Sequence, residues 1–575
     1  MIIIPLSVYS QTLLTPFERD TLSSTTYNEC IEYYKELAKS FDDVKVIEYG
    51  ETDSGKPLHL VIVSKDKLFE PEAIRNSGKI VLLVNNGIHP GEPDGIDACM
   101  MLMRDLAMDK MPGLLEHVVV ITIPIYNIDG VLNRNNYSRV NQVGPKEYGF
   151  RGNAQNRDLN RDFIKCDTKN AESFVQIFQQ WKPELFVDTH VSDGADYTYT
   201  MTLISTLYNK LDPGLSSYMT KELIPYLEKD MKAKNMEMCP YVDTYKSTPD
   251  SGLVGLYDSP RYSTGYVSQF NTIGFMPETH MLKTHAERVR AQYQFLVSLL
   301  KAANSDYEKI RTNKITADEN TTNKQDYVIQ WQLDTNNYSK FLFKGYDAKY
   351  KKSDVTGFER LYYDRDAPYS KDINYYDNYI PVVTISKPIA YIIPRAWRQI
   401  FDLLWLNGVV PKWLSKDQSI EVESYYIDTF STRVPPFEGH YLHSNTKVKT
   451  ITQSRKFYEG DYVVYTNQVS NNFIMNMLEP QADDSYFNWN FFDAILQQKE
   501  YYEPYLFEDI ADSILKTDPE LRKQFEKKKN DANFKNDPNA QLDFIYNNSR
   551  YHEPEYMRYP VARLIKNQVL RIGNE

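Results

Sequence analysis

The chain has 575 residues, more than one hydrophobic core usually serves, so we expect two or more domains. Charged residues make up 25% and hydrophobic residues 42% of the sequence, as in globular proteins that fold in water. The formal net charge of −12 argues against nucleic acid or an anionic membrane surface as a partner. The four cysteines are widely spaced, so neither a disulfide framework nor a thiolate zinc site is expected.

The first eleven residues are apolar and then abruptly polar, like the end of a secretory signal peptide without its basic segment. We therefore expect residues 1–20 to be a signal-peptide remnant and lead-in, and the protein to be exported to a periplasm or secreted. The alternative is a loose N-terminus. No apolar run reaches the length of a membrane span.

The first regular elements are a helix and a hairpin. Residues 25–38 carry apolar side chains at helical spacing, and residues 44–49 and 58–63 read as two strands. The stretch between the strands, residues 50–57, begins like a phosphate loop. Pro57 stands where that loop needs Ser or Thr, and a strand follows instead of a helix, so we predict a hairpin turn.

A polar loop follows the next strand. Residues 79–84 form a continuous apolar run typical of a strand buried on both faces, and residues 96–106 suit a helix with Asp94 as its N-cap. His89 and Glu92 lie between them, at the carboxyl end of a predicted parallel strand. Open α/β sheets place their sites at such ends.

Strands and helices then alternate up to residue 302, which predicts a mixed, mostly parallel sheet with helices on both faces. An irregular segment, residues 134–163, interrupts the pattern, and irregular loops of this length are usually functional or disordered. His190 and Glu278 each end one of the strands. The strands are residues 118–124, 184–189 and 273–277, and the helices are residues 171–181, 215–233 and 286–302.

The composition becomes polar and charged near Asn304, which predicts a linker over residues 304–326. Beyond it we expect a separate α+β C-terminal region, residues 327–575, of unknown role. Its expected strands are residues 327–333, 340–343, 421–426 and 462–465, with a helix at 396–406 and mostly helical structure over 488–534.

The residues at the strand ends suit a metal-dependent hydrolase. His89, Glu92 and His190 supply the two imidazoles and one carboxylate of an open, catalytic zinc site. Zinc lowers the pKa of water and polarises a carbonyl, and Glu278 could move the proton. Arginines in the irregular loop could grip a substrate carboxylate at two points. This set describes hydrolysis of an amide bond beside a free carboxylate.

The order and spacing of these residues resemble the zinc carboxypeptidase family of the carboxypeptidase A type. His89-x-x-Glu92 matches its metal pair, and His190 matches its third ligand. Its Asn-Pro-Asp-Gly stretch is similar to residues 127–130, and its Gly-Arg-x-Asn and Asp-Leu-Asn-Arg segments are similar to residues 151–161.

The resemblance implies one zinc ion, a carboxypeptidase-like fold over a catalytic domain at residues 21–303, and peptide or protein C-termini as substrates. By the same resemblance Glu278 would be the general base and then the general acid, and Arg151 would stabilise the oxyanion. Asn160 and Arg161 would bind the terminal carboxylate. The family's substrate-capping tyrosine is best matched by Tyr266, with Tyr262 and Tyr257 as competitors.

Other histidines receive structural interpretations. His280 and His285 follow Glu278 and are expected to be structural, and His440-x-x-His443 lacks an accompanying carboxylate cluster. Two other functions stay open. One is a zinc amidohydrolase acting on a small acylated amino acid or a cell-wall peptide, and the other is an inactive peptide-binding relative. A serine hydrolase lacks support because no Gly-x-Ser-x-Gly elbow is present.

Overall fold

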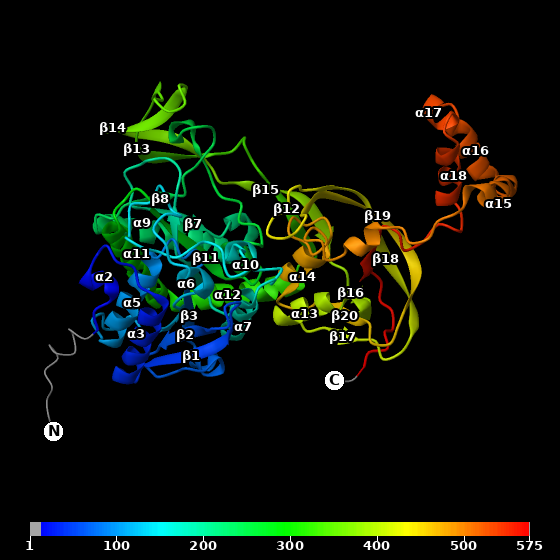
Figure 1. Ribbon diagram of the computed structural model, residues 1–575. Helices are drawn as coiled ribbons and strands as arrows, with labels where there is room; N and C mark the ends of the chain where they lie inside the picture. The colour runs from blue at the N-terminus through cyan, green and yellow to red at the C-terminus, as the bar shows by residue number, and fades with distance from the viewer. Residues whose placement is uncertain (1–12, 574–575) are drawn as a thin grey trace.

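The computed structural model describes residues 13–573 (Figure 1). The predicted signal-peptide segment, residues 1–11, lies outside the described residues, and export stays a prediction. Among residues 13–573, no helix is both long enough and apolar enough to cross a lipid bilayer.

A nine-stranded mixed sheet forms the centre of the N-terminal half, in the order β1-β2-β4-β3-β5-β11-β7-β8, with β6 also paired to β11. The predicted hairpin, helices and buried strands of this half are confirmed. The strands are β1 (Val44–Glu51), β2 (Pro57–Val63), β3 (Ile80–Asn85), β4 (Val118–Ile123), β5 (Leu185–Asp188), β6 (His190–Ser192), β7 (Met201–Ser205), β8 (Met238–Pro240) and β11 (Ile273–His280).

The strand order creates a switch point next to β3. The chain leaves β3 to form its parallel neighbour β4 on one side, and later returns to form β5 on the other side. Open α/β sheets place their sites at such switch points, at the carboxyl ends of the strands. The predicted site residues His89, Glu92 and His190 all follow these two strands.

Helices cover both faces of the sheet, as predicted. Phe186 and Phe275 lie on adjacent strands but point to opposite faces, since Phe275 pairs in register with Val187 rather than Phe186. Phe186 packs on Phe174 of α7, whereas Phe275 packs on Phe295 of α11. The helices of this half are α2 (Pro16–Arg19), α3 (Tyr27–Ser40), α4 (Pro71–Ser77), α5 (Asp94–Ala107), α6 (Ile128–Leu132), α7 (Lys169–Trp181), α8 (Pro213–Tyr218), α9 (Ile224–Ala233), α10 (Ser263–Ser268) and α11 (His285–Ser305).

The prediction of Asp94 as an N-cap is wrong. Pro93 caps α5, and Asp94 is the first helical residue. Its buried carboxylate accepts hydrogen bonds from His285 Nδ1 (2.8 Å) and Arg288 Nε (2.7 Å) instead of capping the helix. Asp94 therefore ties the start of α5 to α11.

Residues 304–326, predicted as a polar linker, contain α12 (Tyr307–Asn323). Ile310, Ala317 and Thr321 of this helix are buried, and the first two belong to the main hydrophobic core. The main hydrophobic core therefore continues through residues 304–326. A domain boundary at these residues stays a prediction.

The C-terminal region is α+β, as predicted, and lies beside the N-terminal half (Figure 1). A six-stranded sheet runs in the order β17-β20-β16-β21-β18-β19, and β12 pairs with β15. The strands are β12 (Asp326–Leu333), β13 (Ser339–Lys352), β14 (Glu359–Tyr376), β15 (Tyr379–Ser386), β16 (Ala390–Ile393), β17 (Lys412–Trp413), β18 (Gln418–Thr432), β19 (His443–Phe457), β20 (Tyr462–Tyr465) and β21 (Arg558–Leu564).

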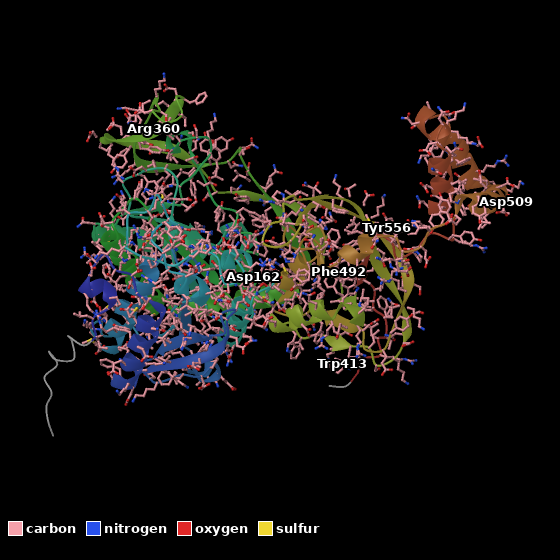
Figure 2. The ribbon with its side chains drawn as sticks, viewed as in Figure 1. Asp162, Arg360, Trp413, Phe492, Asp509 and Tyr556 are labelled. Carbon is pink, nitrogen blue, oxygen red and sulfur yellow. The ribbon has the colours of Figure 1, made fainter. Side chains whose placement is uncertain are left out.

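Two parts of this region stand away from the rest. The β13–β14 hairpin carries Arg360, and a cluster of four short helices carries Asp509 (Figure 2). The hairpin extends a small sheet with β9 (Asp243–Thr244) and β10 (Leu253–Val254), whereas the helical cluster has its own hydrophobic core. The helices are α13 (Arg398–Leu406), α14 (Asn471–Leu478), α15 (Pro504–Thr517), α16 (Pro519–Lys528), α17 (Ala532–Lys535) and α18 (Pro538–Asn547), the last four forming the cluster.

Candidate metal centre and active site

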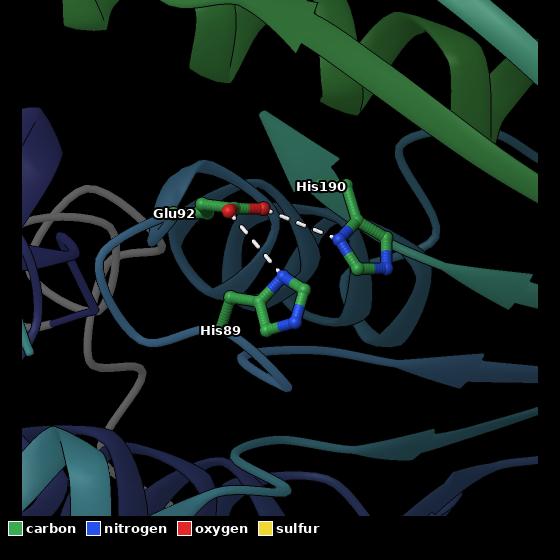
Figure 3. Close-up of side chains that lie close together, drawn as sticks. All are labelled: His89, Glu92 and His190. Atoms are coloured by element: carbon green, nitrogen blue, oxygen red, sulfur yellow. Dashed lines mark hydrogen bonds and ion pairs between the residues drawn. The ribbon is translucent and has the colours of Figure 1, made fainter. Parts of the chain in front are cut away.

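The structure brings the three predicted zinc ligands together (Figure 3). One nitrogen or oxygen atom from each of His89, Glu92 and His190 lies within 4.8 Å of the other two, and all three side chains are buried. The Glu92 N–H donates to the His89 carbonyl (2.8 Å), so a tight turn places both side chains on one side. Gly95 has no room for a side chain because Thr189 lies against it, so the start of α5 packs closely against the link between β5 and β6.

The ring nitrogens of both histidines are oriented for a metal. His89 Nδ1 and His190 Nδ1 lie 3.3 Å and 3.2 Å from the Glu92 carboxylate oxygens (Figure 3). The opposite nitrogens are held by other carboxylates, His89 Nε2 by Asp158 (3.0 Å) and His190 Nε2 by Asp188 (3.1 Å). A carboxylate that holds one ring nitrogen in this way orients the other for a metal.

His89 Nδ1 is buried without a hydrogen-bond partner, which is costly unless another group satisfies it. A bound metal cation would give His89 Nδ1 the partner that it lacks. Burial alone would raise the pKa of Glu92, but the Arg139 guanidinium and the imidazoles of His89 and His190 outweigh burial and hold that pKa well below its usual value. Glu92 is therefore an anionic ligand, and the donor set fits zinc.

Glu278 lies directly beside His190, because the two residues are partners in register on the parallel strands β11 and β6. Its side chain is buried. Burial raises the pKa of Glu278 to about 7, against the effect of His190 and with the help of the negative charges of Glu92 and Asp193. A carboxyl group with a pKa near neutrality can both accept and return a proton.

The predicted arginines lie around the same carboxylate that orients His89. Arg151 binds Asp158 Oδ2 through both Nε (3.0 Å) and Nη2 (2.9 Å), and its Nη1 lies 3.6 Å from Glu92. Arg161 Nη1 lies 3.8 Å from the same Asp158 oxygen. Its guanidinium stacks 4.4 Å from the centre of the Tyr262 ring. The Asn160 Oδ1 atom accepts a hydrogen bond from the Ser263 N–H (3.0 Å).

The prediction of Tyr266 as the substrate-capping residue is wrong. Tyr266 is fully buried, and its hydroxyl donates to Asn407 Oδ1 (2.8 Å) in the C-terminal region. Aromatic rings from α7 and α14 surround it, including Phe178 and Phe473. The two competitors are both partly exposed, but Tyr257 donates to Asp483 (2.8 Å), whereas Tyr262 lies against Arg161. Tyr262 is therefore the tyrosine of the three that best fits a position beside the substrate.

Two site residues were missed by the sequence analysis. Arg139 Nη1 lies 2.7 Å from Glu92 Oε1, closer than Arg151. Tyr241 follows the edge strand β8, and burial together with the charges of Glu278 and Asp193 raises the pKa of its hydroxyl. Arg139 lies in the irregular segment, where no periodicity points to it. Asp158 and Asp188, which hold the two histidines, are detectable from the sequence, because each lies two residues from a predicted site residue, Asn160 and His190.

The remaining predicted histidines pair with carboxylates but form no second metal cluster within residues 13–573. The structural interpretation of His280 and His285 stays a prediction. The contacts are His280 Nε2 to Asp196 (3.7 Å), His285 Nδ1 to Asp94 (2.8 Å), His440 Nε2 to Asp167 (2.9 Å) and His443 Nε2 to Asp493 (3.1 Å).

Comparisons with known proteins agree with this site. Residues 30–227 match the family described as zinc carboxypeptidase. Carboxypeptidase 2 of Trichophyton rubrum is 22% identical over 487 residues, which cover 81% of this chain and 84% of that protein. Probable carboxypeptidase 2 of Arthroderma benhamiae is 21% identical over 485 residues, with 81% and 86% covered. Because 81% of the chain is aligned, the similarity extends beyond residue 326 or so into the C-terminal region.

Solved structures with a similar chain trace include a metallo-carboxypeptidase from Burkholderia cenocepacia, with a TM-score of 0.37, 13% identity, and coverage of 49% of this chain and 70% of that one. Carboxypeptidase A from Helicoverpa armigera has a TM-score of 0.38, 16% identity, and coverage of 53% and 81%. TM-scores this low carry no weight. The evidence for the family is the match over residues 30–227 together with the cluster of His89, Glu92 and His190. Residues 30–227 form a zinc carboxypeptidase domain that holds all three ligands, so the protein is a peptide-bond hydrolase with zinc as its metal.

Proposed function

We propose that the protein is a carboxypeptidase that hydrolyses the C-terminal peptide bond of peptides or proteins. One observation carries the proposal. The carboxylate of Asp158 orients the metal ligand His89 and also lies against Arg151 and Arg161. Cationic groups that can bind a substrate carboxylate are therefore tethered to the metal centre itself. A peptide whose terminal carboxylate binds there has its last amide bond close to the metal.

The zinc ligands would be His89 Nδ1, His190 Nδ1 and a carboxylate oxygen of Glu92. Zinc held by these atoms supplies Lewis acidity, which acidifies water and polarises a carbonyl. Asp158 and Asp188 keep the two imidazoles in the orientation that directs Nδ1 toward Glu92. Arg139 helps to keep Glu92 ionised and placed.

Glu278 would take the proton of the attacking water and return it to the leaving amine. It lies outside the ligand cluster, beside His190, and its pKa of about 7 suits both halves of the transfer. Its burial excludes bulk water that would otherwise compete for the proton.

Asn160 and Arg161 would bind the terminal carboxylate of the substrate, and Arg151 would stabilise the negative charge that develops on the scissile carbonyl. Stacking on the Tyr262 ring holds the planar Arg161 guanidinium in position. Arg139 is a second candidate for the oxyanion, because it also lies within reach of Glu92.

Mass spectrometry of a mixed peptide library, incubated with the zinc-loaded protein, tests the proposal. We expect peptides to shorten one residue at a time from the carboxyl end. Cleavage of small N-acylated amino acids in place of peptides would favour the amidohydrolase. No cleavage by protein that holds zinc would favour the inactive relative, although Glu278 and all three ligands are retained.

A further inference from the structure

The connection between β18 and β19 contains a tight turn at residues 437–440. Phe437 and His440 exchange backbone hydrogen bonds of 2.7 Å and 3.0 Å, and the two residues between them, Glu438 and Gly439, have φ angles of 50° and 77°. Two positive φ angles in a row define the hairpin turn that best matches the twist of the strands. A glutamate is an uncommon residue for a left-handed position, which draws attention to its side chain.

That side chain reaches back 280 residues in sequence to the metal centre. Glu438 Oε2 accepts a hydrogen bond from the Asp158 N–H (2.8 Å), and the Glu438 carbonyl oxygen accepts one from Arg157 Nη1. Gly439 has no room for a side chain, because the Arg157 guanidinium lies against it. The tip of the turn is therefore fitted closely to residues 157 and 158.

The Asp158 carboxylate contacts both a proposed metal ligand and an arginine of the proposed active site. Its Oδ1 atom lies 3.0 Å from His89 Nε2 and also accepts the Asn160 N–H (2.9 Å). Its Oδ2 atom binds Arg151. A small displacement of this one backbone position would move a metal ligand and a cation that faces the substrate together.

The turn is itself held in place from behind. His440 Nε2 lies 2.9 Å from Asp167 Oδ2, which also accepts from Lys165 Nζ (2.8 Å). The buried Trp489 contacts the His440 ring edge-on, with centroids 5.5 Å apart, and Phe437 stacks on it at 6.2 Å. The turn is therefore held on two sides, by Asp167 of the N-terminal half and by the buried Trp489 of the C-terminal region.

We propose that Glu438 is a positioning residue for the metal centre: by binding the Asp158 backbone, it lets the C-terminal region set the orientation of His89. This inference rests on the proposed function, because it takes His89 to be a zinc ligand. Groups that orient a metal-bound histidine typically change metal affinity about 10–100-fold when lost. Glu438 acts one residue further out, so we expect a smaller effect than that range, about three- to tenfold.

The test measures zinc affinity by chelator competition on full-length protein, together with the melting temperature of the zinc-free form. Glu438→Ala removes the acceptor, and Glu438→Asp shortens it. Glu438→Gln keeps an amide oxygen at the same reach, and Asp158→Asn is the positive control. Glu526→Ala, on an exposed position of α16 with no side-chain partner, is the matched negative control.

We expect weaker zinc binding in Glu438→Ala and Glu438→Asp, rescue in Glu438→Gln, and no change in Glu526→Ala. Zinc affinity within twofold of the unmutated protein in both weakened variants would overturn the proposal, and so would an unchanged Asp158→Asn. A lower melting temperature with unchanged zinc affinity would assign Glu438 a merely structural role. If the unmutated protein binds zinc but cleaves no peptide, the proposed function fails while this series still gives its answer.

Discussion

Glu278 and His190 are partners in register on two parallel strands, so the carboxylate proposed as the base stands beside a metal ligand without belonging to the ligand cluster. The backbone pairing fixes this relationship, and it does not depend on a loop. A residue held so rigidly can move protons without being drawn into the coordination of the metal.

Glu278→Gln should therefore keep the zinc and lose turnover. The amide cannot accept the proton of the attacking water, so kcat should fall by at least about a hundredfold, the usual scale for a positioned acid or base. Elemental analysis and steady-state kinetics on one preparation give both values. Loss of zinc from this variant would make Glu278 a ligand and overturn its assignment as base.

His190→Ala should lose most of the zinc, since two ligands remain where an open catalytic site needs three. Asp188→Asn should have a smaller effect, because it removes only the carboxylate that orients the His190 ring. We expect its zinc affinity to fall about 10–100-fold. Chelator competition measures both variants, and full zinc retention by His190→Ala would remove His190 from the site.

The sequence was informative where short-range physics decides the structure. Apolar runs marked β3 and β5 because these strands are buried on both faces, and the ligands follow the ends of those strands. The order of the ligands along the chain was sufficient to assign them to one site. The order of the strands in the sheet could not be predicted in this way, because it depends on how the chain crosses between strands, which no local sequence pattern specifies.

The errors and omissions involve contacts between distant segments. Tyr266 had the expected spacing, but its ring packs on Phe473 of the C-terminal region, which spacing before Glu278 cannot reveal. Arg139 lies in the irregular segment, and Glu438 reaches the site from a turn 280 residues away. Chemistry that depends on such contacts becomes visible only in three dimensions.

Asp97 should make the stability of the protein depend on pH. Burial raises the pKa of this carboxyl to about 6, whereas His285 and Thr25 act in the opposite direction. Between the unfolded pKa of about 3.9 and about 6, the folded protein binds the proton and the unfolded chain does not, so stability falls as the pH rises through this window. The total loss is about 3 kcal/mol.

Asp97→Asn should avoid that loss, because a neutral amide can still accept from Thr25 and can donate toward His285 Nε2, which lies 3.8 Å from Asp97 Oδ2. The variant should match the unmutated protein near pH 4 and exceed its stability from about pH 6 upward. Denaturant unfolding of both proteins in the presence of a chelator, from pH 4 to 8, measures the difference. A difference that does not change with pH would contradict the prediction.

Arg151→Ala and Arg139→Ala should separate the two oxyanion candidates. If Arg151 stabilises the charge on the carbonyl, its loss should lower kcat for every peptide by about 10²–10³-fold, as for other oxyanion donors. Arg139 binds Glu92 at 2.7 Å, so its loss should mainly change zinc affinity. The reverse pattern, a large kcat loss only in Arg139→Ala, would move the oxyanion role to Arg139.

Attack from the carboxyl end should depend on the charge of the substrate's last residue. If Asn160 and Arg161 bind the terminal carboxylate, each charge-assisted hydrogen bond contributes about 1.5–3 kcal/mol, roughly ten- to a hundredfold in affinity. Amidation removes the charge and leaves these donors poorly matched, so kcat/KM should fall by at least about a hundredfold.

Arg161→Ala should lose this discrimination and cleave free and amidated peptides with similar, low efficiency. Tyr262→Ala is the informative companion, because it removes the ring on which Arg161 stacks and leaves the guanidinium in place. A guanidinium without that support is less well placed, so discrimination should fall by an intermediate amount. The measurement is kcat/KM for paired peptides that differ only in their C-terminal group. Equal cleavage of both peptides by the unmutated protein would exclude recognition of the carboxylate, and the amidohydrolase alternative would then become the better account of the site.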